Sequence, residues 1–154
     1  MRIFIIILIT SLFSCIHASA REPLVLRLTK TMTISDETDA TVFCAHPAID
    51  EQSRITGLMF QKTLPEKAGM VFDFGEMQIV SMWMRNTILP LDMIFFDDAG
   101  RVVNIATNTK PFSLDIISSE KPSKFVLEVN AGVAKKFGLN VGDQVTFGDN
   151  DCKL

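Results

Sequence analysis

Short runs of strand-forming residues, each ended by a turn signal within a few positions, constrain the fold of this chain more than any other feature. Residues 31–34 and 40–45 alternate between polar and apolar side chains around the polar stretch Ser35-Asp36-Glu37, which predicts a β-hairpin. Proline lacks an amide donor, so the segment around Pro90 is expected to be a loop, a bulge or a sheet edge. Further strands are predicted at 69–74, 79–85, 92–96, 102–105, 125–129 and at the end of 140–147.

Two short helices are predicted from their capping residues. Asp50 can cap a helix that runs to about residue 56, and Gly57 can end it. Asn130 predicts the cap of a second helix that reaches about residue 137 and is closed by Gly138. With about seven short strands and these helices, the sequence predicts an α+β, β-rich fold: a single compact barrel- or sandwich-like sheet domain.

The first 20 residues have the pattern of a secretory signal. Arg2 supplies a positive charge, residues 3–13 form an apolar run, and Ala18-Ser19-Ala20 fits a small-residue cleavage site. The run is shorter than the about 20 residues that cross a bilayer, so no transmembrane anchor is expected in the mature form. A buried N-terminal helix or a retained anchor is the alternative.

This pattern divides the chain into three parts: a signal peptide at 1–20, an N-terminal lead and first strand at 21–39, and one β-rich domain at 40–154. We therefore expect a periplasmic or secreted protein. The stretch Leu12-Phe13-Ser14-Cys15 also resembles a lipobox, so a lipoprotein modified at Cys15 stays open as an alternative.

The charge balance argues against nucleic acid and anionic lipid as partners. The chain carries 15 Lys and Arg against 18 Asp and Glu, a formal net charge of −3. Removal of residues 1–20 would take away Arg2 and no acid, which changes this charge to −4. An acidic chain has no general attraction to phosphate backbones. We expect a monomer.

Cys44 and Cys152 would remain after removal of the signal. In an oxidising compartment, an even pair of cysteines most simply forms one disulfide. That bridge would tie the C-terminal tail to an early strand and close a loop of about 100 residues, worth roughly 4–5 kcal/mol in the chain-entropy model. Two free thiols are the alternative.

The most unusual residues of the chain lie in the stretch VSMWMRNTILPLDMIFF, residues 80–96. On a strand, Met82 and Met84 would face one way, and Trp83 and Arg85 the other. A tryptophan that alternates with methionines most often fills a core. Asp92 follows the break at Pro90, and an aspartate beside a turn most often accepts backbone amides.

The same stretch allows a functional interpretation. Arg85, Asn86, Thr87 and Asp92 would form a polar cluster at the end of a strand, beside Trp83. Such a cluster could bind a small polar or anionic group, because a guanidinium presents the fork of donors that this binding favours. It is the best candidate site in the sequence.

Metal, cofactor and nucleophile chemistry have little support. Seven methionines would remain after processing, but they are scattered among apolar neighbours as in an ordinary core, so no metal site and no cofactor are predicted. Cys44 and His46 could form a thiol–imidazole pair, although a disulfide would consume the thiol. The sequence has no G-x-S-x-G elbow and no glycine-rich phosphate loop.

Three segments resemble one protein family: GLMFQKTLPEKAGMVFDF, MWMRNTILPLDMIFFDDAGRVVNI and FVLEVNAGVAKKFGLNVGDQV. Together they are similar to the "domain of unknown function 192" family, small and often exported proteins, over roughly residues 40–147. The resemblance implies a compact β-rich domain and no established activity. The chain departs from the family pattern at Thr56, where a basic residue is usual, and at Met82, where an aromatic residue is common. Cys44 and Cys152 lie outside that pattern.

Two functions from different classes stay open. The first is a non-catalytic exported module that binds a small polar ligand, a glycan or an envelope protein through Trp83 and the polar cluster. The second is a hydrolytic enzyme that uses Asp92 as acid or base. The lack of a complete catalytic set in the sequence favours the binding module.

Overall fold

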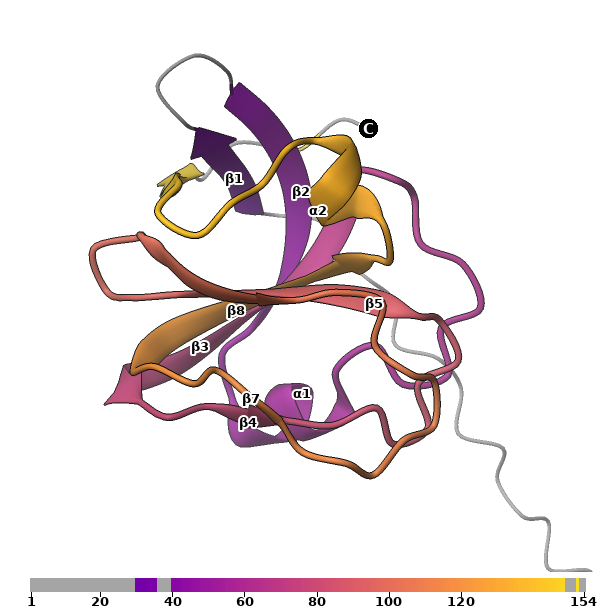
Figure 1. Ribbon diagram of the computed structural model, residues 1–154. Coiled ribbons are helices and arrows are strands. Elements are labelled where there is room, and N and C mark those ends of the chain that lie inside the picture. Colours follow the sequence, from indigo (N-terminus) through magenta and orange to yellow (C-terminus); the bar gives the residue numbers. More distant parts are fainter. Residues whose placement is uncertain (1–29, 36–39, 149–151, 153–154) are drawn as a thin grey trace, which may run out of the picture.

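The computed structural model describes residues 30–35, 40–148 and 152 (Figure 1). The predicted signal peptide at 1–20, with the lipobox cysteine Cys15, lies outside the described residues. So do residues 21–29 of the predicted lead and the turn residues Asp36 and Glu37. Among the described residues, no helix is long and apolar enough to cross a membrane.

Seven strands form one sheet in the order β6-β5-β8-β3-β2-β1-β9, and two short strands, β4 and β7, pair separately (Figure 1). Two helices, α1 (Glu51–Thr56) and α2 (Val133–Lys136), complete the described structure. The strands are β1 (Lys30–Ser35), β2 (Ala40–Ala48), β3 (Ala68–Gln78), β4 (Ser81–Met82), β5 (Leu91–Phe96), β6 (Val102–Ala106), β7 (Ile117–Ser118), β8 (Ser123–Asn130) and β9 (Gln144–Gly148).

The sheet is antiparallel except at one pair, β2 and β3, which run parallel. Parallel neighbours need a crossover, and here α1 and the loop after it carry the chain between them. The sheet curls, so that β1 and β2 stand steeply above the layer of β5 and β8 (Figure 1). The structure thus confirms a β-rich α+β domain with a curled sheet and two short helices.

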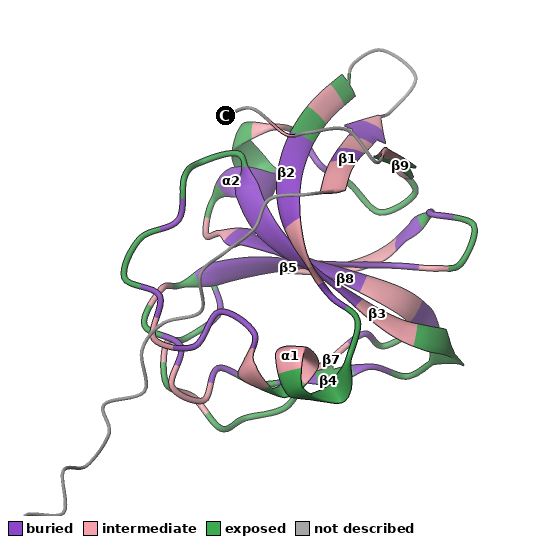
Figure 2. Cartoon of the chain, turned by 180° about the vertical axis from the view of Figure 1, so that it is seen from behind, coloured by how far each residue is buried: buried purple, intermediate pink, exposed green. Residues whose placement is uncertain are grey.

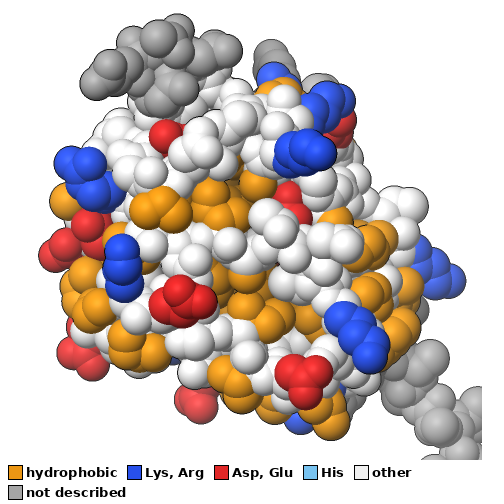
Figure 3. Space-filling model, in the orientation of Figure 1, with side chains coloured by type: hydrophobic (Ala, Val, Ile, Leu, Met, Phe, Trp, Pro, Cys, Tyr) orange, Lys and Arg blue, Asp and Glu red, His pale blue; other side chains and the backbone are white. Residues whose placement is uncertain are grey.

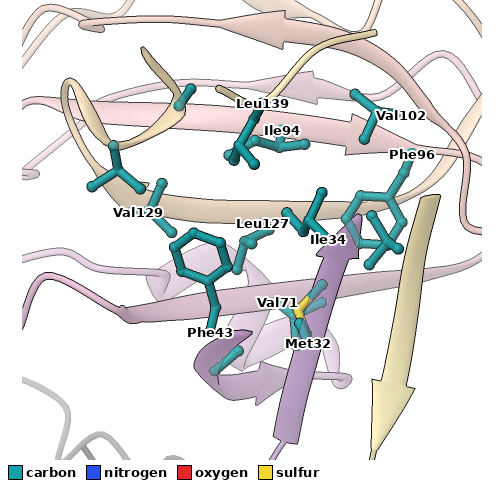
Figure 4. Packing of buried hydrophobic residues seen from close by; sticks show 14 residues of the cluster. Met32, Ile34, Phe43, Val71, Ile94, Phe96, Val102, Leu127, Val129 and Leu139 are labelled. Carbon is teal, nitrogen blue, oxygen red and sulfur yellow. The ribbon is translucent and has the colours of Figure 1, made fainter. Parts of the chain in front are cut away.

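The central strands bury both of their faces, and β5 is buried at every one of its six positions (Figure 2). Alternate side chains of a strand leave the sheet on opposite sides. Ile94 and Phe96 therefore enter a first core with β1, β2 and α2 (Figure 4), whereas Met93 and Phe95 enter a second core near α1, β4 and β7. A strand buried on both faces reads as a continuous apolar run, and residues 93–96 of β5 show such a run after the single charged residue Asp92.

A glycine sets the spacing between β3 and β8. A Cβ atom built at Gly69 would lie 2.5 Å from the backbone oxygen of Glu128 and 2.9 Å from a side-chain carbon of Leu127. No side chain fits in that space without displacing a strand. Gly69 is therefore the residue that lets these two strands pair closely at this level.

The disulfide between Cys44 and Cys152 is present, as predicted. The two Cα atoms are 5.5 Å apart, and the cysteines are separated by 108 residues in the sequence. Cys44 lies in β2 and is buried. The bridge therefore fixes Cys152, which follows β9 in the sequence, to an inner strand of the sheet.

Two local predictions are wrong. The predicted strand at 79–85 is reduced to β4, because its pairing with β7 covers only Ser81 and Met82 before the chain turns. The predicted cap of the second helix is also wrong, because Gly132 precedes α2 and Asn130 instead donates its side-chain amide to the Leu64 carbonyl at 2.8 Å. By contrast, Asp50 caps α1 through a hydrogen bond from the Ser53 amide, as predicted.

Candidate functional site

Asp92, the candidate acid or base, serves as a structural anchor. Its side chain is fully buried, and its two carboxylate oxygens accept the backbone amides of Asn108 at 2.8 Å and Ala134 at 2.9 Å. Ala134 lies in the first turn of α2, where backbone amides lack helical partners and a negative charge is favourable. The carboxylate thus joins β5 to a loop and to a helix, and it has no open side on which to receive a substrate.

Asn86 and Thr87 form a turn. Asn86 has a φ of 57°, in the left-handed region that asparagine tolerates better than most residues, as the turn prediction implied. The backbone of Thr87 donates to the Met84 carbonyl and accepts from the Phe112 amide. These bonds attach the turn to the loop between β6 and β7.

That loop carries three exposed apolar side chains. Phe112, Leu114 and Ile116 are each at least 60% exposed. Figure 3 shows hydrophobic side chains reaching the surface between scattered charged ones on the face seen in Figure 1.

Of the two interpretations of Trp83, the structure contradicts the one in which it fills the core, and its role in ligand binding stays a prediction. The side chain is 38% exposed, whereas its neighbours Met82 and Met84 are buried in the second core. The guanidinium carbon of Arg85 lies 4.2 Å from the centre of the indole ring, so these two residues do share one side, as the alternation predicted. This stack covers the ring with a cation and leaves the other parts of the indole accessible.

A cavity of about 250 Å³ lies between α1, the middle of β3, the β4 segment and β8. Of the predicted cluster it brings together Trp83 and Thr87, but Asn86 and Asp92 do not line it, and Arg85 only approaches it through its stack on Trp83. Its full lining is Glu51, Arg54, Ile55, Thr56, Gly57, Leu58, Met59, Phe72, Phe74, Ser81, Met82, Trp83, Thr87 and Glu128.

The buried acid of this cavity is Glu128, which is not among the predicted site residues. It lies in β8 between Met70 of β3 and Met93 of β5, and only 4% of it is exposed. Among the described residues, none forms a hydrogen bond or an ion pair with its carboxyl group. Burial in these surroundings raises the pKa of Glu128 from its ordinary 4.5 to about 8.

A signal for Glu128 is present in the sequence. It is the one charged residue inside the apolar run FVLEV, and acids are almost never fully buried unless they are paired. A charged residue at the centre of a predicted buried strand therefore indicates either an ion-pair partner inside the protein or a functional site. The sequence could not say which, because the lining of the cavity comes from positions as far apart as Glu51 and Glu128.

Arg54 is the basic residue of the cavity lining, and its position is fixed. One of its terminal nitrogens, Nη1, donates to the backbone oxygens of Ile49 at 2.6 Å and Asp73 at 3.0 Å. Its guanidinium carbon lies 5.8 Å from the centre of the Phe74 ring. Arg54 thus holds α1 against β3, and it forms no ion pair with Glu128.

The chemistry of the cavity follows from this lining. When protonated, Glu128 can donate one hydrogen bond; when ionised, it offers a buried negative charge to a ligand. Its nearest cross-strand neighbours supply thioethers, which are apolar and polarisable. No group of three or more His, Cys, Asp and Glu residues that could hold a metal ion occurs in the described ranges.

A curled β-rich sheet with two short helices and an acid-containing cavity defines a domain of the α+β class. Residues 32–147 match the model of the DUF192 family, described as "Uncharacterized ACR", and the chain belongs to this family. A comparison with curated proteins found no match.

Two solved structures are similar to the chain. One is a "putative transcription regulator" from Sinorhizobium meliloti 1021, with 36% identity and a TM-score of 0.77, covering 80% of this chain and 97% of the other. The second is a protein of unknown function from Novosphingobium aromaticivorans DSM 12444, with 34% identity and a TM-score of 0.73, covering 75% and 83% of the two chains.

Proposed function

We propose that this protein is an exported, non-catalytic domain that binds a small ligand in the cavity next to Glu128. The observation that carries the proposal is the buried, unpaired carboxyl group of Glu128 at that cavity. A buried polar group without a partner is costly, and such groups are retained where a ligand completes their hydrogen bonds. A strongly perturbed acid in a concave site is a general mark of function.

The shape and lining of the cavity support the same conclusion. Small-molecule sites are concave and mostly apolar, with a few polar groups that orient the ligand. Here Leu58, Phe72 and Met82 supply apolar wall, while Thr87 and Glu128 supply the polar groups. Trp83 at the cavity offers an amphipathic aromatic face of the kind that binding sites favour.

Export is supported by the signal-like pattern of residues 1–20 and by the disulfide between Cys44 and Cys152. Disulfides persist in oxidising compartments such as the periplasm. N-terminal sequencing of the protein recovered from cells would test this: a mature chain that begins at Arg21 agrees with the predicted cleavage, and one that begins at a lipidated Cys15 indicates the lipoprotein alternative.

The name of the Sinorhizobium relative suggests a role in transcription, but this chain has a formal net charge of −3. Non-specific attraction to DNA depends on Lys and Arg that neutralise phosphates. An acidic domain with an unpaired carboxyl group in a cavity is better suited to a small molecule.

Blocking the cavity tests the binding function. Ser81 lines the cavity, and its partner across the β4–β7 pair, Ser118, does not. Ser81→Phe should remove the thermal stabilisation given by compounds found in a fragment screen of the wild type, and the matched variant Ser118→Phe should keep it. Equal responses of the two variants to every such compound would contradict binding in this cavity.

A further inference from the structure

We propose that the ligand of this cavity is a small organic cation, a protonated amine on an apolar body, whose ammonium group pairs with the carboxylate of Glu128. This inference rests on the proposed function, because it requires that the cavity is a small-ligand site.

The charges around the cavity lack one cation. Glu128 and Glu51 both line it, and Arg54, the basic residue of the lining, is engaged with two backbone carbonyls and lies over Phe74. A carboxylate removed from water without a counter-ion is strongly disfavoured, whereas a paired and hydrogen-bonded one is tolerated. A ligand that brings a positive charge therefore supplies what the described residues do not.

The remaining charged groups near Glu128 do not fill this role. His46 lies in the same row of the sheet but two strands away, beyond Met70. Asp92 projects from the opposite face, because Met93, and not Asp92, is the register partner of Glu128. Arg85 lies on the indole ring of Trp83 and does not line the cavity.

The walls suit the rest of an amine. An ammonium group has three donors, and beside Glu128 the hydroxyl oxygens of Thr87 and Ser81 in the lining can accept the others. The ring of Phe72 and the thioether of Met59 offer polarisable surface for a cation and its carbon chain. A cavity of about 250 Å³ has room for on the order of eight water-sized groups, which limits the ligand to a small amine.

The charge of the ligand determines how binding responds to pH. Because burial raises the pKa of Glu128 to about 8, about one-tenth of this group is ionised at pH 7 and about nine-tenths at pH 9. A cation that binds the ionised form should therefore gain about tenfold in affinity over this interval, since an alkylamine, like lysine, stays protonated to about pH 10. A neutral ligand that accepts a hydrogen bond from the protonated acid should lose affinity by a similar factor.

The test compares n-butylammonium with 1-butanol, which has the same carbon chain and no charge. Trp83 is the single tryptophan, the chain has no tyrosine, and the indole lines the cavity, so its fluorescence reports binding directly. We expect n-butylammonium to bind more tightly than 1-butanol and to gain about tenfold from pH 7 to pH 9.

Variants locate the effect at Glu128. Glu128→Gln should lose at least tenfold in affinity for n-butylammonium at pH 9 and should lose the pH response, since its amide cannot ionise. Glu76→Gln removes an exposed acid outside the cavity and should behave as the wild type. The preference for the amine and its pH response are measured on the wild type, so they remain decisive even if Glu128→Gln does not fold.

The outcomes separate the two proposals. If 1-butanol binds more tightly and its affinity falls between pH 7 and pH 9, the cation is wrong and the cavity remains a ligand site. If neither compound changes the fluorescence of Trp83 or the melting temperature at any pH while compounds from the fragment screen do, the cation is wrong and the cavity remains a ligand site. If no compound of either kind changes them, both the cation and the small-ligand function are overturned.

Discussion

Asp92 and Glu128 lie on adjacent strands one residue out of register, so that their carboxyl groups leave the sheet on opposite faces. On one face of the sheet, the carboxylate of Asp92 accepts the backbone amide of Ala134 in α2. On the other face, Glu128 lines the cavity. Two buried acids on neighbouring strands thus have different roles, because the carboxylate of Asp92 accepts two backbone amides and that of Glu128 accepts none among the described residues.

Glu128 should make stability depend on pH. The folded protein holds its proton up to a pKa of about 8, whereas the unfolded chain releases it near 4.5. Between these values the unfolding free energy should fall as pH rises, by at most about 1.4 kcal/mol per pH unit, and the contribution is complete below 4.5 and lost above 8. Urea titrations at several pH values should show this decline in the wild type and not in Glu128→Gln. Parallel profiles would contradict a buried, titrating Glu128.

Asp92→Asn should destabilise the fold by about 2–4 kcal/mol, because it replaces two charge-assisted hydrogen bonds with one neutral bond and places an amide group against a backbone donor. Asp97→Asn is the matched control, since Asp97 accepts only the amide of Arg101 in an exposed turn. Urea denaturation gives both values, and n-butylammonium binding should be unchanged in each. A stable Asp92→Asn variant that had lost this binding would return Asp92 to the functional site.

Trp83→Ala should cost about 1–2 kcal/mol, less than the about 3–5 kcal/mol typical of a buried aromatic residue, because a substantial part of the indole is exposed. Phe95→Ala provides the comparison, since Phe95 is fully buried in the second core. Unfolding followed by circular dichroism measures both. Equal losses for the two variants would mean that Trp83 belongs to the core.

Reduction of the bridge between Cys44 and Cys152 should lower the unfolding free energy by about 2–5 kcal/mol, because the sequence separation of 108 residues closes a long loop. Urea denaturation with and without reductant measures the change. The double variant Cys44→Ser, Cys152→Ser should match the reduced protein and show no response to reductant. Free thiols in the unreduced, purified protein would contradict the bridge.

Thr56→Arg should supply the cavity with its missing cation. Thr56 lines the cavity with Glu128 and stands where the family resemblance implies a basic residue. A nearby guanidinium should lower the pKa of Glu128 toward its ordinary value, flatten the pH dependence of stability and weaken n-butylammonium binding. Thr107→Arg, at an exposed position outside the lining, should do neither. An unchanged pH profile in Thr56→Arg would mean that the two positions do not interact.

The sheet could be predicted from the sequence because its central strands carry their signal locally. The apolar run at residues 93–96 of β5 and the hairpin of β1 and β2 depend on periodicity and turn residues alone. β4 and β7 could not be predicted, because two paired residues leave no periodic pattern. The start of α2 could not be predicted for another reason. The side chain that accepts the Ala134 amide in its first turn belongs to Asp92, which is 42 residues away in the sequence.

The candidate site was harder to predict from the sequence than the sheet, because its residues come together only in the tertiary structure. Alternation predicted that Trp83 and Arg85 share a side, but not which side faces the core, since that depends on where the short β4 pairing ends. The buried acid in β8 was visible as a charge in an apolar run. Its importance depends on the position of α1, which no local pattern encodes.

The position of Glu128 in the cavity depends on Gly69, although Gly69 does not line the cavity. Any larger residue there would push β3 away from β8 at the level of the Glu128 backbone, and so tilt the acid relative to the opposite wall. In a saturation mutagenesis experiment selected for ligand retention, position 69 should therefore tolerate as little change as position 128, although its own atoms form no part of the lining.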